Sequence, residues 1–410
     1  MIVYILMLVL SILFLILEKK AKKRWIKILC CIMAVMPFFV VSAFRYDLGT
    51  DYTRRYVFDY NRTLQGVDVP NLEILFKGIM KFCMIFTEEP YLMFAITSAI
   101  IVGFILGTSF TKSQDKILSV CIFLLGGFFF DSLNIMRQYM AMSLIFFGYQ
   151  FLLKSKRWYL AYIAIVIIAT LIHSSAIIML ILVLLNKKML VSWKWVLPVC
   201  VIIVLLNENL MNILEFFVQN TRFSVYLTGK LAQGEFSYLF VAENLIIYLM
   251  MMYIYSKNKK LDNIQTQDIL FLNIQALALI VMVLGSTHML FIRTALYFSI
   301  FQVISLPYYI SKIPVKEVIK DLKKITRNKF KFSKLEKYMK QVVTLVVILC
   351  FVFAFTRTNI LVNTNEVFDS ILDGAKKYGI KNTTHITSCC MGKRNSCGKH
   401  PETNEKLIWR

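Results

Sequence analysis

Apolar runs separated by short charged or turn-forming segments occupy most of this chain. Their composition is typical of α-helices that cross a membrane, although several are shorter than the roughly 20 residues that a hydrocarbon core requires. The runs lie near residues 2–17, 26–44, 91–110, 117–133, 139–153, 158–172, 174–185, 193–206, 238–255, 268–284, 289–306 and 341–356. This pattern predicts an all-α, polytopic integral membrane protein with about 12 transmembrane helices. If runs 158–172 and 174–185 form a single re-entrant hairpin, His173 still lies at its tip.

The basic residues in the turns predict the orientation of the chain, because short cytoplasmic loops are enriched in lysine and arginine. Lysine is abundant in the turns that follow the odd-numbered runs, at residues 18–24, 112–116, 154–157, 186–188, 257–260 and 312–340. We therefore expect these turns on the cytoplasmic side and both termini on the outer side.

Composition supports a membrane protein and removes the need for a nucleic-acid partner. The chain is 58% hydrophobic, with a mean hydropathy of +0.65, which excludes an ordinary soluble domain. Its net charge of +23 is explained largely by cytoplasmic lysines that face anionic lipid headgroups. Within segment 312–340, apolar residues recur at helical spacing, which predicts an amphipathic helix at the membrane interface. A segment that docks a partner protein is the alternative.

We expect one transmembrane domain, residues 1–356, followed by an extracytoplasmic and poorly ordered tail, residues 357–410. The tail contains Cys389, Cys390 and Cys397, but their spacing fits no two-by-two ligand pattern for zinc, so no metal site is predicted. The first apolar run lacks a preceding basic segment and is followed by EKKAKKR, a stop-transfer pattern. We therefore expect no cleavable signal peptide.

Arginine and histidine gather in the turns that are predicted to face outward, whereas the inward turns carry mostly lysine. Orientation requires only positive charge, but a planar guanidinium can also hold a phosphate or carboxylate with two parallel hydrogen bonds. Each residue alone has an ordinary explanation, such as an ion pair of Arg45 with Asp47 or Asp51, or an arginine that snorkels to the interface. Together they predict an anion site, formed by Arg45, Asp51, Tyr52, Arg137, His173, Arg222, His288 and Arg293.

The order of these segments resembles the EpsG family, over about residues 1–310. The resemblance rests on FRYDLGTDYTRRY, the glutamate of NLEILF (Glu73), NIMRQYMAMSL, LIHSSAIIML, RFSVYL and IRTALYF followed by PYY. Members of this family are Wzy-like polymerases and related membrane proteins of bacterial exopolysaccharide, capsule and O-antigen assembly. The tail after about residue 360 has no counterpart in the resemblance.

The resemblance implies a metal-independent glycosyltransferase, without a cofactor, in the bacterial cytoplasmic membrane. Such an enzyme takes an oligosaccharide from a polyprenyl diphosphate and transfers it, at the outer face, to a hydroxyl of the next lipid-linked unit. Arg45, Arg137 and Arg293 are then expected on the departing diphosphate, where guanidinium contacts strengthen as charge develops. Arg222 and His288 are expected to bind substrate as well. Anionic lipids and a chain-length regulator are the other expected partners.

Deprotonation of the acceptor hydroxyl needs a base within reach. His173 is the first candidate and Asp51 the second, and Asp51 with Tyr52 is also expected to contact sugar hydroxyls or to orient Arg45. The nearby tyrosines suit stacking on sugar rings, although they suit an interfacial aromatic belt as well.

Two other functions fit parts of the pattern. A transporter of lipid-linked glycan would also have about 12 spans, but it would need charged groups along a path through the bilayer, and often two related halves. No such halves are seen in the sequence. An acyltransferase that decorates the polysaccharide would require a catalytic histidine that receives its donor from the cytoplasmic side, and the cytoplasmic turns contain no histidine.

Overall fold

The computed structural model describes residues 2–46, 51–70, 72–185, 192–206, 213, 216, 238–285, 289–326 and 333–356. All regular secondary structure in these segments is helical, so the predicted all-α class is confirmed for them. The chain divides into two compact units, Met1–Ile348 and Leu349–Arg410. Of the second unit, only residues 349–356 are described. The cysteines of the tail lie outside the described residues.

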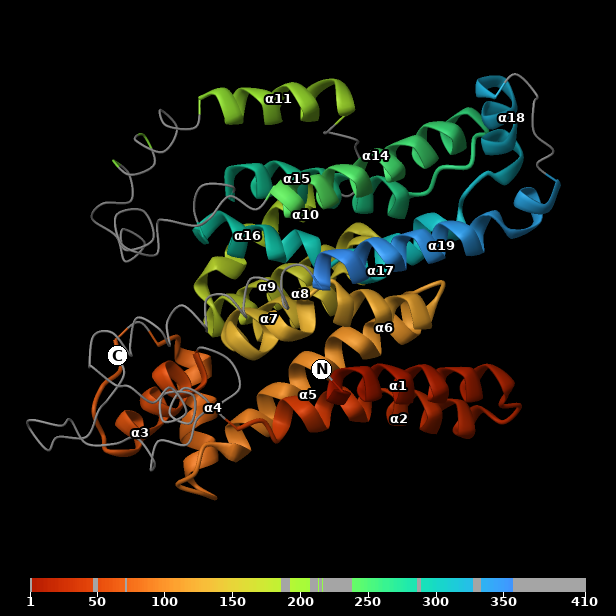
Figure 1. The fold of residues 1–410 in the computed structure, drawn as a ribbon. Helices are drawn as coiled ribbons and strands as arrows, with labels where there is room; N and C mark the ends of the chain where they lie inside the picture. The colour runs from red at the N-terminus through yellow and green to blue at the C-terminus, as the bar shows by residue number, and fades with distance from the viewer. Residues whose placement is uncertain are drawn as a thin grey trace, which may run out of the picture. The chain divides into compact units, whose positions relative to one another are not determined.

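The helices follow one another along the chain in the order labelled in Figure 1. They are α1 (Ile2–Lys20), α2 (Arg24–Ala43), η1 (Tyr52–Val57), α3 (Phe58–Leu64), α4 (Ile74–Met84), α5 (Tyr91–Lys112), α6 (Lys116–Leu125), α7 (Phe128–Asn134), α8 (Met136–Leu152), η2 (Lys156–Trp158), α9 (Tyr159–Ile172), η3 (Ser174–Ile181), α10 (Leu182–Leu185), α11 (Trp193–Leu205), α14 (Tyr238–Lys260), α15 (Thr266–Gly285), α16 (Met289–Ser299), α17 (Gln302–Ser311), α18 (Val315–Ile325) and α19 (Ser333–Thr356).

Among the described residues, five helices are long and apolar enough to cross a membrane, namely α2, α5, α14, α15 and α19. Two bent pairs raise the number to seven if each pair is one span: α6 with α7, bent by 50°, and α16 with α17, bent by 42°. The predicted number of 12 is not reproduced. Several predicted spans are interrupted or short, since α8 has 17 residues and α9 has 14.

Polar contacts join the lysine-rich helix ends to one another. The amine of Lys116, at the start of α6, lies 3.0 Å from the Glu18 carboxylate near the end of α1. The amine of Lys257, near the end of α14, lies 2.5 Å from Asp321 of α18. Helix α18 is the amphipathic segment expected from the sequence, with Ile319 buried on its apolar side. The predicted cytoplasmic turns 18–24 and 112–116 are therefore neighbours, and so are 257–260 and 312–340.

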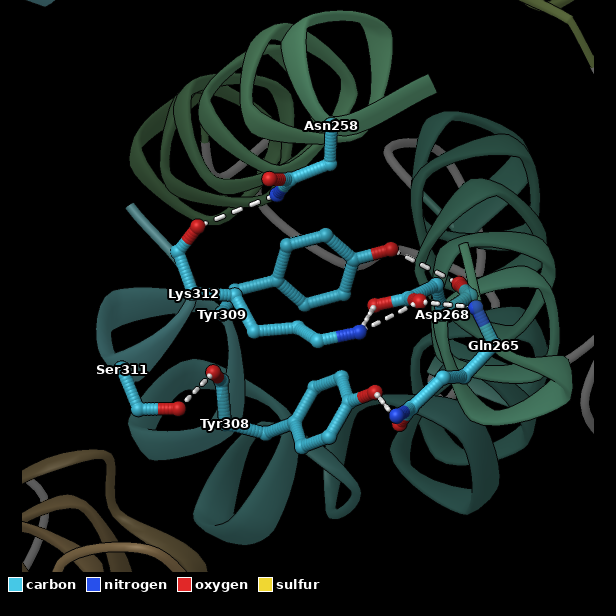
Figure 2. Close-up of polar contacts among 7 residues, drawn as sticks. All are labelled: Asn258, Gln265, Asp268, Tyr308, Tyr309, Ser311 and Lys312. Carbon is cyan, nitrogen blue, oxygen red and sulfur yellow. Dashed lines mark hydrogen bonds and ion pairs between the residues drawn. The ribbon is translucent and has the colours of Figure 1, made fainter. Parts of the chain in front are cut away.

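A buried ion pair joins α15 to α17 beside the turns 257–260 and 312–340 (Figure 2). Asp268 accepts hydrogen bonds from the Lys312 amine at 2.7 and 3.0 Å, and both side chains are largely shielded from solvent. The Tyr309 hydroxyl donates to the backbone oxygen of Asp268, and the Asn258 amide donates to the backbone oxygen of Lys312. Three helices, α14, α15 and α17, are thereby held at their ends.

The break between α6 and α7 is made by two glycines. Gly127 has a φ of 79°, a left-handed conformation that a residue with a Cβ rarely adopts. A Cβ on Gly126 would lie 2.6 Å from the backbone oxygen of Ile122. This break turns α7 away from the axis of α6 and directs Asp131 toward a cavity that Gly126 also lines.

Candidate functional site

Glu73 is the residue on which the candidate site is built. It immediately precedes α4 in extended backbone conformation, and its side chain makes no capping bond to its own helix. Instead, Oε2 lies 2.7 Å from Nη1 of Arg137, while Oε1 lies 3.4 Å from Nδ1 of His173 and accepts the Ser174 backbone N–H at 3.3 Å. One carboxylate therefore contacts both α8 and the start of η3.

Arg137 is held in the first turn of α8. Ile135 interrupts the helix between α7 and α8, so the guanidinium leaves the new helix close to its N-terminus. A positive charge at this end of a helix is disfavoured by the helix dipole. The Glu73 carboxylate compensates, and the ring of Phe76, with its centroid 5.8 Å from Cζ of Arg137, covers the guanidinium.

His173 occupies the turn between α9 and η3. The Tyr162 hydroxyl of α9 donates to the backbone oxygen of Met179 in η3 at 2.8 Å, which shows that α9 and η3 lie side by side. His173 is therefore at the tip, as predicted. Glu73 completes this turn, because its carboxylate accepts an N–H at the start of η3, where a helical segment favours an anion.

Burial and nearby charges determine the protonation states of Glu73 and His173. Burial raises the pKa of Glu73, but the contact with His173 and the charge of Arg137 outweigh it and lower the pKa to about 2. Burial lowers the pKa of His173 below 6.5, and the charges of Arg137 and Arg55 add to this effect against the opposing influence of Glu73. At neutral pH the site thus contains a carboxylate, a guanidinium and an uncharged imidazole.

A cavity of about 170 Å³ opens beside these residues. It is lined by Asp51, Arg55, Tyr56, Glu73, Ile135, Arg137, Gln138, His173, Ser174, Ser175, Leu290, Arg293 and Thr294. The structure thus brings together Asp51, Arg137, His173 and Arg293 from the predicted set, although they come from four distant parts of the chain.

Arg293 reaches the cavity from the first turns of α16. The Gln138 amide donates to the backbone oxygen of Arg293 at 2.5 Å and ties α16 to α8. Close packing with α15 fixes this helix as well, since a Cβ on Gly285 would lie 2.7 Å from the backbone nitrogen of Ile292. Arg293 is therefore placed by backbone contacts on both neighbouring helices.

Arg45 and Tyr52 do not line the cavity. The Arg45 guanidinium is buried, with Cζ 4.8 Å from the ring centroid of Phe94 and Nη2 donating to the Met136 sulfur at 3.2 Å. Burial lowers the pKa of Arg45 to about 10. Tyr52 is 3% exposed and stacks on Phe94, with ring centroids 4.7 Å apart. The structure places these two residues in the packing behind the site.

Arg222 and His288, the remaining predicted site residues, lie outside the described residues. Two charged lining residues, Glu73 and Arg55, were not predicted as site residues. Glu73 was noted as the glutamate of NLEILF in the family resemblance, without a role, and nothing in the sequence indicated that its partners would lie in later segments. Arg55 was counted among the outward arginines without a role.

The comparison with known protein families agrees with the sequence resemblance. The model of the EpsG family matches residues 27–368. No curated protein and no solved structure matches the chain significantly. The matched region contains the whole of the cavity lining described above.

Proposed function

Because the chain belongs to the EpsG family, we propose that it is a Wzy-like polymerase that joins polyprenyl-diphosphate-linked oligosaccharide units. The observation that carries this proposal is the cavity at which Arg55, Arg137 and Arg293 meet the Glu73–His173 pair. Three guanidinium groups suit a diphosphate, whereas an uncharged imidazole suits the transfer of a proton from a hydroxyl.

In the proposed reaction, the hydroxyl oxygen of the acceptor sugar forms a bond with the anomeric carbon of the donor sugar. The bond between that carbon and the diphosphate oxygen breaks, and its electron pair leaves with the polyprenyl diphosphate. The hydroxyl proton passes to the base. Arg137 and Arg293, with Arg55, stabilise the negative charge that develops on the leaving group.

His173 is the proposed base, with Asp51 as the second candidate. Nδ1 of His173 is turned toward Glu73, so Nε2 is the nitrogen that would accept the proton. Glu73 would orient the imidazole and stabilise the imidazolium that forms, while its contact with Arg137 keeps the carboxylate ionised. Arg45 would act from behind the cavity through the packing of Met136, the neighbour of Arg137.

We propose the outer face of the bacterial cytoplasmic membrane as the site of reaction, with about 12 crossings and both termini outside. Anionic lipids at the lysine-rich helix ends and a chain-length regulator are the proposed partners. The proposed product is an exopolysaccharide, a capsule or an O-antigen.

A lipid-glycan profile of a deletion strain tests this function. A polymerase mutant should accumulate single repeat units on lipid at the outer face and lack long polymer. Re-expressed wild-type protein should restore the polymer, whereas Arg137→Ala and His173→Ala proteins should insert normally without restoring it. Accumulation of lipid-linked units on the cytoplasmic face would instead indicate a transporter, and normal polymer in the deletion strain would refute both functions.

A further inference from the structure

A second cavity, of about 270 Å³, adjoins the first. The two share Asp51, Ile135 and Arg293 in their linings. The second is otherwise lined by Gly126, Phe128, Asp131, Asn134, Phe240, Glu243, Asn244, Met282, Ile292, Leu296, Ser299 and Gln302. Its wall therefore comes mainly from α7, α14, α16 and α17, whereas the first cavity is formed by η1, α8 and the His173 turn.

Uncharged amides form one side of this second cavity. The Asn244 side-chain oxygen accepts hydrogen bonds from the amides of Gln302 at 3.0 Å and Gln275 at 3.1 Å. All three side chains are buried in apolar helices. Buried amides are costly unless they are hydrogen-bonded, and here they bond to one another. The cavity thus has a polar surface that is already formed without a ligand.

Two carboxylates face the same space. Asp131 lies in the apolar helix α7 and Glu243 in the apolar helix α14. Among the described residues, the ion pairs include neither of them. Acidic side chains within membrane-spanning segments are rare and usually mark a path or site for a polar ligand. Neither residue lines the first cavity, although Asp131 interacts electrostatically with Arg293, which lines both cavities.

This set of groups suits a sugar ring. Carboxylates and amide oxygens accept hydrogen bonds from hydroxyls, and Ser299 together with the amides can donate. Phe128 and Phe240 offer aromatic faces to the apolar side of a ring. A diphosphate is disfavoured here by Asp131 and Glu243. The two cavities therefore differ in charge: the first is lined by three arginines and two acidic residues, whereas the second is lined by one arginine, Arg293, and three acidic residues.

We infer that the second cavity is a saccharide subsite, which binds the sugar directly linked to the diphosphate in the first cavity. This inference rests on the proposed function. It places the bond that breaks at the shared wall, beside Asp51 and Arg293. Arg293 would contact the diphosphate at this wall, and Asp51 would accept a hydrogen bond from a sugar hydroxyl.

Binding to the purified full chain in nanodiscs tests the subsite with two probes. One probe is polyprenyl diphosphate without sugar, and the other is the lipid-linked unit extracted from the deletion strain. Asp131→Asn and Glu243→Gln should each weaken binding of the lipid-linked unit about 10-fold, since each replaces an acceptor oxygen of a carboxyl group with an NH2 that can only donate. Binding of the sugar-free lipid should remain unchanged. Glu317→Gln, on α18 at the opposite helix ends, is the matched control and should alter neither affinity.

The outcomes separate this inference from the proposed function. Unchanged affinity of both acidic variants for the lipid-linked unit, or an equal loss for both probes, overturns the saccharide subsite. Arg137→Ala should weaken both probes, and undiminished binding of the sugar-free lipid by that variant overturns the diphosphate site instead. Both acidic substitutions keep the size of the side chain, and if one variant unfolds, the other carries the test.

Discussion

Oε2 of Glu73 lies 2.7 Å from Nη1 of Arg137, and only 10% and 7% of the two side chains are exposed. Removal of either partner from such a pair leaves the other charge buried and uncompensated, which is more damaging than the loss of an exposed pair. The same carboxylate contacts His173 and the backbone of Ser174. Stability and chemistry at this site are therefore expected to change together when Glu73 is altered.

Two substitutions at Glu73 should separate its contribution to stability from its contribution to polymer formation. Glu73→Ala should destabilise the protein by about 3 kcal/mol, because Arg137 loses its buried partner. Glu73→Gln keeps one acceptor oxygen, which can accept from Arg137 or from the Ser174 N–H but not from both, so it should destabilise the protein less than Glu73→Ala and still lose most polymer formation. Thermal unfolding in detergent and polymer length on gels measure the two effects. Wild-type polymer from both variants would remove Glu73 from the site.

Arg137→Lys tests whether the planar guanidinium is required. Lysine keeps the positive charge and can still pair with Glu73, but it cannot bind two phosphate oxygens in parallel. Chain insertion and thermal stability should remain close to wild type, while polymer formation falls at least about 10-fold, the effect expected of losing one charge-assisted hydrogen bond. Lys81→Arg, at the end of α4 and away from the cavity lining, serves as a control for exchange between the two residues. Normal chain lengths in Arg137→Lys would show that a point charge suffices.

The pH dependence follows from His173. Burial lowers its pKa below 6.5, so the uncharged form that accepts a proton persists at pH 6.5 and is lost only at lower pH. Polymerisation should therefore decline on the acid side at a pH below 6.5. Arg55→Gln removes a charge that lowers this pKa and should shift the decline to higher pH. A pH profile measured on membranes checks both statements, and an acid limb above pH 6.5 in wild type would contradict the assignment of His173.

Gly127→Ala tests the break that directs Asp131 into the second cavity. Gly127 has a φ of 79°, and a left-handed conformation is about 1–2 kcal/mol less favourable for a residue with a Cβ. Gly78 provides the matched control, because it lies inside α4 with open space where a Cβ would be placed. Gly78→Ala should leave the unfolding temperature unchanged or raise it slightly. Equal effects of the two substitutions would show that the break tolerates a side chain.

Lys312→Met should destabilise the protein by about 3 kcal/mol, because Asp268 would remain buried without its cation. The double variant Lys312→Met with Asp268→Asn should recover part of this loss, since the uncompensated charge is gone. Lys77→Met is the control, because its partner Asp68 is largely exposed, and a negligible change is expected there. Unfolding temperatures of the four proteins decide the question, and full stability of Lys312→Met would refute the buried pair.

The helical class and the proximity of Asp51, Arg137, His173 and Arg293 could be predicted from the sequence. Apolar runs identify helices, and charges at their ends identify which ends lie together. His173 is found at a tip because a polar pair, Ser174 and Ser175, follows it between two apolar runs. The number of spans could not be predicted, since no glycine or proline marks the break before Gln302 and several helices are shorter than a full span.

The contacts between site residues could not be predicted either, because they join distant segments of the chain. Glu73 is 64 positions from Arg137 in sequence, and no local spacing rule relates residues so far apart. Asp131 and Glu243 did leave a signal, because each is an acid within or at the edge of an apolar run, where an ionisable group is costly. Attention to such acids, in addition to the arginines, would have indicated the second cavity.

Glu73 also precedes, in the chain, every group that its side chain contacts. During synthesis from the N-terminus, the carboxylate is therefore already present when Arg137 and then His173 emerge. Arg137 can therefore pair with its counter-ion as soon as its own helix is inserted. Assembly of the membrane domain would then proceed without a stage in which Arg137 waits for a later segment to supply its counter-ion.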